Sequence, residues 1–162
     1  GFFCSLSSPH LGYMNGTDNM IKAGFWVMRK MMKESKSLDQ LAMVDSNNPE
    51  QTLIYRLSKE GSLKKFKKII LLSSGEDSYV PWHSARICGY DSKRNPNNLE
   101  VVMADRILDD STIHRIDVNF ACEKSDLDGF IGRKAHINLI INESIFKLIN
   151  AVIPNLFDLR EV

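Results

Sequence analysis

The sequence predicts an α/β fold built on about three mostly parallel strands, and three observations support this prediction. Apolar runs typical of strands alternate along the chain with segments of helical periodicity, which is the order that produces a parallel sheet. Residues 69–72 are four consecutive aliphatic side chains, as expected for a strand buried on both faces. The chain of 162 residues is 43% hydrophobic and 25% charged, which suits a folded domain.

The first half of the chain predicts one strand followed by a helical block. Residues 1–7 form a compact apolar run that ends in small residues and a Pro- and Gly-containing turn. Residues 19–60 predict an all-helical block. Within it, apolar side chains at helical spacing predict a helix over 19–33, and two shorter helices are expected over 37–44 and 49–57.

The second half predicts alternating strands and helices. The expected elements, in chain order, are a strand over 66–73, one helical turn over 83–87, a helix over 99–108, an edge strand over 114–121, a loop over 125–133 and a helix over 143–152.

Charge and motif content narrow the function classes. With 21 Lys and Arg against 20 Asp and Glu, the net charge of +1 gives no bulk attraction to nucleic acid. The chain has neither a G-x-x-x-x-G-K-[ST] nor a G-x-G-x-x-G loop, and its four histidines are isolated, so we expect no cofactor and no metal. The widely separated Cys4, Cys88 and Cys122 predict reduced thiols in a cytoplasmic protein.

Two side chains stand where an α/β sheet places reactive groups. Asp77 lies on a loop just beyond the strongest predicted strand, and His136 follows the last one. An acid after one strand and a histidine after the next is the second half of the Ser–Asp–His order of α/β hydrolases. In such a triad the imidazole takes the nucleophile's proton and the carboxylate holds its other nitrogen. Spacing alone leaves open that Asp77 is a turn residue and His136 a core side chain.

Five blocks in order along the chain resemble the lipase-like serine esterase domain found at the C-terminus of the proteins called "family with sequence similarity 135". The blocks are SLSSPHLG at 5–12, GFWVM at 24–28, TLIYRLSK at 52–59, DSYVPWHSARI at 77–87 and IGRKAHI at 131–137. The resemblance extends from residue 3 to about residue 149, and five ordered blocks are more specific than any one of them.

The resemblance implies an α/β-hydrolase fold. It also implies an enzyme that hydrolyses carboxylic esters, including lipid esters. By motif position, Asp77 corresponds to the triad acid and His136 to the triad base. The family's nucleophile lies on a G-x-S-x-G elbow, and none of the nine glycines here has a serine two residues later. The absence of this elbow from the sequence, together with the apolar run directly after Gly1, predicts that residues 1–162 are the latter part of one hydrolase domain. The first strands and the elbow would be missing, and the chain would be inactive alone.

The resemblance also suggests where substrate binds. The helical block 19–60 takes the place of a lipase cap, and Phe25 and Trp26 suit a lid that packs on acyl chains or touches a membrane surface. The other interpretation of these side chains is ordinary core. His10 either shapes the floor of the pocket or is a turn residue bonded to backbone. We expect a lipid or other ester substrate, with the oligomeric state left open. The alternative function is a non-catalytic hydrolase-fold module that binds a lipid or a protein partner.

Overall fold

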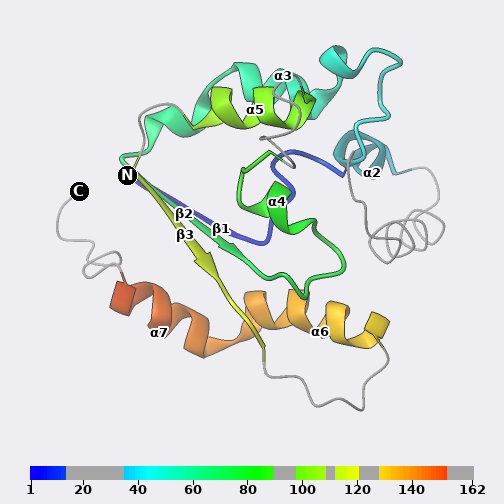
Figure 1. Ribbon diagram of the computed structural model, residues 1–162. Coiled ribbons are helices and arrows are strands. Elements are labelled where there is room, and N and C mark those ends of the chain that lie inside the picture. Colours follow the sequence, from blue (N-terminus) through cyan, green and yellow to red (C-terminus); the bar gives the residue numbers. More distant parts are fainter. Residues whose placement is uncertain (14–34, 90–97, 109–111, 121–127, 153–162) are drawn as a thin grey trace.

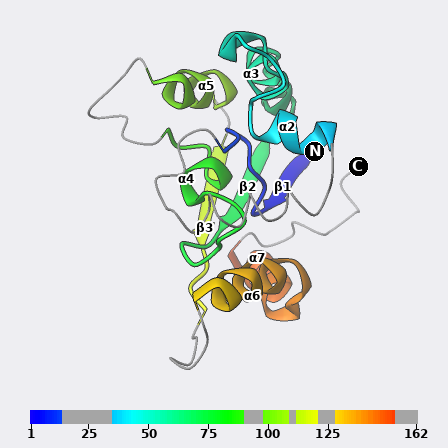
Figure 2. The same ribbon diagram turned by 90° about the vertical axis from the view of Figure 1, so that its right-hand side faces the viewer.

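The computed structural model describes residues 1–13, 35–89, 98–108, 112–120 and 128–152 (Figure 1). Its centre is a parallel sheet of three strands in the order β1–β2–β3, namely β1 (Phe2–Leu6), β2 (Lys68–Ser73) and β3 (Thr112–Asp117). All three strands therefore end at the same edge of the sheet. The parallel sheet with helices on both faces confirms the predicted α/β class (Figures 1 and 2).

The central strand β2 is buried on both faces, as its run of aliphatic residues predicts. The side chains from Ile69 to Leu72 have no exposed surface. Ile69 and Leu71 belong to one core cluster, and Ile70 and Leu72 belong to the other. Because successive side chains point to opposite faces of a strand, β2 supplies both cores of the molecule.

One face of the sheet is covered by α3 (Leu53–Lys59) and α5 (Leu99–Ile107), with α2 (Lys36–Leu41) beside them (Figure 1). The short 3-10 helices η1 (Pro49–Gln51) and η2 (Ser62–Lys65) flank α3 in the chain.

The predicted single helix over 49–57 is wrong in detail, because Thr52 separates η1 from α3. Thr52 has extended backbone angles, with φ −64° and ψ 153°, and its hydroxyl donates to the Pro49 carbonyl at 2.7 Å. The Asp45 carboxylate then accepts from the Leu53 amide at 3.0 Å. A new helix starts at Leu53 because a side-chain acceptor satisfies its first free amide.

The other face is covered by α6 (Asp128–Ile141) and α7 (Glu143–Val152). The predicted helix over 143–152 is confirmed as α7. The predicted loop over 125–133 is wrong from Asp128 onward, where α6 begins. Two glycines in this stretch favour a loop locally, but Ala135 and Leu139 of the same helix are buried. Burial of one helix face outweighs the weak helix propensity of glycine.

The remaining predicted elements are found with shifted ends. The helical turn after Pro81 is α4 (Trp82–Ala85), and the helix expected over 37–44 stops at Leu41. The helix expected over 19–33 falls outside the described residues, so the structure describes the block 19–60 only from residue 35 onward. Within the described parts of the chain, no helix has the length and apolar character needed to cross a membrane.

Candidate active site

Three segments distant in sequence meet where the strands end. Ser7 directly follows β1, Asp77 lies on the loop after β2, and His136 lies on α6 beneath the sheet. The carboxyl edge of a parallel sheet is where α/β proteins place their binding and catalytic groups. The loop after β2 is compact, since the Asp77 amide donates to the Ser74 carbonyl at 3.3 Å. This turn places the Asp77 side chain at the edge.

The Asp77 carboxylate accepts four hydrogen bonds. Its Oδ1 accepts from the backbone amides of Tyr79 at 2.7 Å and Val80 at 3.1 Å. Its Oδ2 accepts from Ser7 Oγ at 2.5 Å and from His136 Nδ1 at 2.7 Å. The side chain has no exposed surface. Four donors match the acceptor capacity of a carboxylate, so the buried group is fully satisfied and fixed in orientation.

The bond to Asp77 determines which nitrogen of His136 is available for chemistry. A carboxylate can only accept, so His136 Nδ1–H is the donor and Nε2 carries the free lone pair of the neutral ring. The ring of Tyr79 packs against the imidazole, with centroids 5.5 Å apart and planes tilted by 59°. The His136 side chain is 25% exposed. The ring is therefore held from two sides while part of it reaches solvent, as a general base requires.

Tyr13 lies near the same carboxylate. Burial, together with the negative charge of Asp77, raises the pKa of the Tyr13 hydroxyl. The phenol is therefore uncharged over the whole neutral range and places no second negative charge beside Asp77.

Helix α4 holds the loop after Asp77 against the ends of the strands. The Asp117 carboxylate, at the end of β3, accepts from Ser73 Oγ at 2.7 Å, from Trp82 Nε1 at 3.1 Å and from the Arg86 guanidinium. Burial acts to raise the pKa of Asp117, but these hydrogen bonds and the Arg86 charge hold it below its usual value. On the opposite side of α4, Ser84 Oγ accepts from the Leu11 amide at 2.9 Å. These contacts tie the segments that follow all three strands to one short helix.

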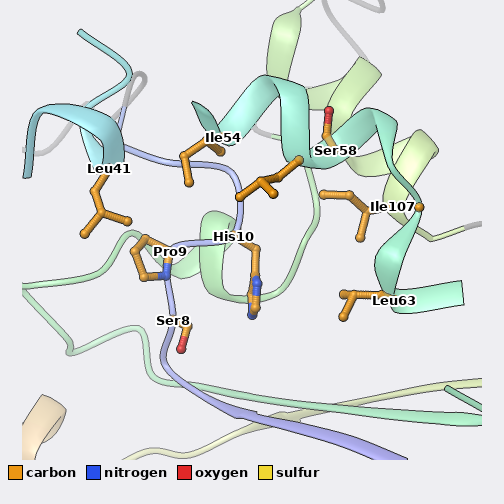
Figure 3. Close-up of a pocket in the computed structure, with 10 residues that line it drawn as sticks. Ser8, Pro9, His10, Leu41, Ile54, Ser58, Leu63 and Ile107 are labelled. Carbon is orange, nitrogen blue, oxygen red and sulfur yellow. The ribbon is translucent and has the colours of Figure 1, made fainter. Parts of the chain in front are cut away.

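His10 lies in a different place from Asp77 and His136. It lines a pocket of about 290 Å³ between the segment after β1 and helix α3 (Figure 3). Its imidazole is within hydrogen-bond distance of Ser5, with Nε2 and Oγ 2.7 Å apart, and its amide donates to the Ser8 carbonyl at 2.9 Å. Burial lowers the pKa of His10 to about 4, so the ring is neutral at pH 7. The lining residues do not include Asp77 or His136.

The structure thus brings together two of the five site residues expected from the sequence. Phe25 and Trp26 fall outside the described residues. Among the described residues, no group of three His, Cys, Asp or Glu side chains is arranged to hold a metal ion. Cys4 and Cys88 are free thiols, and burial raises the pKa of each.

Sequence reasoning missed Ser7 and Tyr79. Ser7 had a usable signal, because it ends the first predicted strand, and the ends of neighbouring parallel strands lie side by side. Tyr79 had none, because its contact with His136 depends on where α6 packs.

Comparison with known protein families identifies a family to which this chain is similar. The model of the family described as "Putative serine esterase (DUF676)" matches residues 1–91. The matched range includes β1, β2, Ser7 and Asp77, whereas His136 lies beyond it. No match was found among solved structures. Since the family model covers more than half of the chain, the chain belongs to the family described as putative serine esterase (DUF676).

Proposed function

We propose that this chain supplies the acid and the base of a serine esterase that hydrolyses carboxylic esters, with lipid esters as the substrate class. The observation that carries the proposal is the 2.7 Å hydrogen bond between His136 Nδ1 and Asp77 Oδ2. Membership of a serine esterase family supports the same chemistry. The finer resemblance, to the C-terminal domain of the proteins called "family with sequence similarity 135", is part of this proposal.

In the proposed reaction, Nε2 of His136 takes the proton of a serine hydroxyl as the serine oxygen attacks the ester carbonyl. The alcohol then leaves with that proton, and an acyl-enzyme remains. A water molecule attacks the acyl-enzyme, gives one proton to Nε2 and releases the acid, and the serine regains its proton from Nε2. Asp77 fixes the ring and stabilises the imidazolium in both steps.

We propose that the nucleophile is a serine on a G-x-S-x-G elbow in a segment upstream of Gly1, and that the 162 residues alone have no turnover. Two observations support this. No glycine of the chain is followed two residues later by serine, and β1 pairs with β2 on one edge only among the described strands. An elbow strand paired with the other edge of β1 would end beside Ser7 and Asp77.

We propose that the His10 pocket, which is lined by neither Asp77 nor His136, takes the far end of the acyl chain. The pocket is lined mainly by apolar side chains, and its imidazole is uncharged at neutral pH. Phe25 and Trp26 would cover the bound acyl chain or contact a membrane surface. We propose that the protein is cytoplasmic. A series of esters of increasing acyl length tests the pocket, since activity should rise with length up to the capacity of the pocket and then fall. Activity independent of length would contradict it.

The triad assignment is tested in the natural protein extended upstream of Gly1, with a fluorophosphonate probe and short acyl esters. His136→Ala and Asp77→Asn should lose labelling and turnover by about 10⁴-fold while remaining folded. The matched control is His83→Gln, because His83 is also paired with a carboxylate, but with Glu100 of α5, at 3.3 Å. If His136→Ala reacts with the probe like the unaltered protein, His136 is not the base.

The alternative is a non-catalytic hydrolase-fold module that binds lipid or a protein partner. It is favoured by the large apolar side chains exposed on α6 and α7, among them Ile140, Ile141 and Phe146. The two functions are distinguished by the coding sequence upstream of Gly1. A serine elbow there supports the esterase, and an elbow without serine supports the binding module.

A further inference from the structure

Ser7 is a second side-chain partner of the Asp77 carboxylate. Its hydroxyl donates to Oδ2 at 2.5 Å, the same oxygen that accepts from His136 Nδ1. We propose that Ser7 is a positioning residue, which holds the Asp77 carboxylate in the orientation that orders His136. This inference rests on the proposed esterase function.

The Ser7 bond differs from the other fixed contacts of the carboxylate. The Tyr79 and Val80 amides that bind Oδ1 belong to the same loop as Asp77, so they move whenever the loop moves. Ser7 belongs to a different strand segment, 70 residues away in sequence. Its amide also donates to the Leu72 carbonyl at 2.9 Å, which extends the pairing of β1 with β2. Ser7 therefore fixes the carboxylate relative to the sheet rather than to its own loop.

The backbone at Ser7 supports a role for the side chain. Ser7 has φ +47°, in the left-handed region. For a non-glycine residue this conformation costs about 1–2 kcal/mol, and glycine, asparagine and aspartate are the residues that usually adopt it. If the segment needed only the turn, glycine would serve better. In this conformation the Ser7 hydroxyl makes a buried hydrogen bond to Asp77 that glycine could not make.

Burial excludes direct contact between Ser7 and a substrate. Ser7 is 3% exposed, and its hydroxyl faces Asp77. We therefore expect any effect of Ser7 on catalysis to pass through Asp77 and His136. Loss of the hydroxyl should lower kcat and leave KM unchanged, because ester binding does not involve Ser7.

The experiment compares Ser7→Ala and Ser7→Gly in the extended protein. Both substitutions remove the hydroxyl. Glycine adopts φ +47° without strain, so Ser7→Gly provides a folded variant if the Ser7→Ala protein does not fold. The control is Thr52→Val. Thr52 is also buried, but its hydroxyl donates at 2.7 Å to the Pro49 carbonyl ahead of α3 rather than to Asp77.

Two measurements are made on each variant. The first is the low-field proton resonance of His136 Nδ1–H, which reports the bond to Asp77 and does not require a nucleophile. The second is kcat and KM for a short acyl ester. Both Ser7 variants should weaken or broaden the resonance. They should also lower kcat by roughly 10-fold or more, the effect that losing a supporting hydrogen bond has on the ligands of metal sites. Thr52→Val should change neither.

The outcomes separate this inference from the proposed function. An unchanged resonance in Ser7→Gly overturns the positioning role, whatever the activity shows. A kcat equal to that of the unaltered protein in a folded Ser7→Gly also overturns it. If the unaltered protein has no esterase activity but the resonance is lost in both Ser7 variants, the esterase proposal fails, while Ser7 is still shown to order the Asp77–His136 pair.

Discussion

At the scale of single residues, the partners of each histidine decide what its ring can do. His136 bonds a buried carboxylate and has a partly exposed ring, so a proton taken up at Nε2 is balanced by the charge of Asp77. His10 bonds a neutral serine hydroxyl in a partly buried place, and burial lowers its pKa to about 4. The same side chain is therefore suited to proton transfer in one place and to an uncharged pocket wall in the other.

The lowered pKa of His10 predicts an acid-sensitive fold. Between pH 6.5 and about 4 the unfolded chain binds a proton at this ring that the folded chain does not, so the free energy of unfolding falls as the pH falls. The loss over this range is at most about 3 kcal/mol. His10→Gln cannot take up the proton, so its melting temperature should fall less over the same range. Melting curves from pH 7.5 to 4 measure the difference. If the melting temperature of the two proteins changes equally with pH, His10 is not the group that makes the fold acid-sensitive.

At the scale of elements, one glycine determines how closely α5 approaches the segment after α4. A Cβ added at Gly89 would lie 2.6 Å from the Val101 Cα and 2.8 Å from its amide nitrogen. These are backbone atoms of α5 and cannot rotate away. Gly89 thus lets the helix that covers one face of the sheet pack against the segment that carries Arg86.

We therefore expect Gly89→Ala to destabilise the fold by about 1–3 kcal/mol, the usual cost of inserting a methyl group into close packing. The matched control is Gly75→Ala, because a Cβ at Gly75 meets no atom within 4 Å and should change stability by less than about 0.5 kcal/mol. Urea unfolding midpoints of the two variants test the prediction. A similar midpoint for both would contradict the close approach.

The elements also show which features could be predicted from sequence. The strand β2 was predictable because four adjacent aliphatic residues have few alternatives to burial on both faces of a sheet. The pairing of Asp77 with His136 could be predicted from their order in the sequence, one after β2 and the other after β3, because parallel strands bring their ends together. The helix around His136 was not predictable in full, since the glycines in its first turns suggest a loop and only packing under the sheet overrides them. The hydrogen bond from Ser7 to Asp77 could not be predicted, because it depends on the register of β1 against β2.

At the scale of the whole molecule, the two layers of helices are unequal. Among the described residues, the core under α3 and α5 contains nine buried side chains, whereas the core over α6 and α7 contains five. Because the hydrophobic free energy scales with buried apolar area, we expect the α6–α7 layer to be the more weakly held of the two. This is also the layer that carries His136, so the hydrogen bond between Asp77 and His136 depends on the smaller of the two described clusters.

Leu139 is one of the fully buried residues of this layer. It has no exposed surface and lies in the cluster with Ile70 and Leu72 of β2, three residues along α6 from His136. Leu139→Ala should cost about 2–5 kcal/mol, because it removes buried methyl groups and leaves a cavity. The control is Ile141→Ala on the same helix, since Ile141 is 66% exposed and its truncation empties no core space.

Amide hydrogen exchange distinguishes loss of the layer from loss of the whole fold. If the layer opens by itself, α6 and α7 exchange before α3 and α5 in the unaltered protein, and Leu139→Ala accelerates exchange in α6 and α7 with little change elsewhere. The same variant should lose the His136 Nδ1–H resonance, because the ring leaves Asp77 whenever α6 leaves the sheet. Uniform acceleration over all four helices would instead mean that the two cores unfold as one unit, and that His136 is held by the global stability of the molecule.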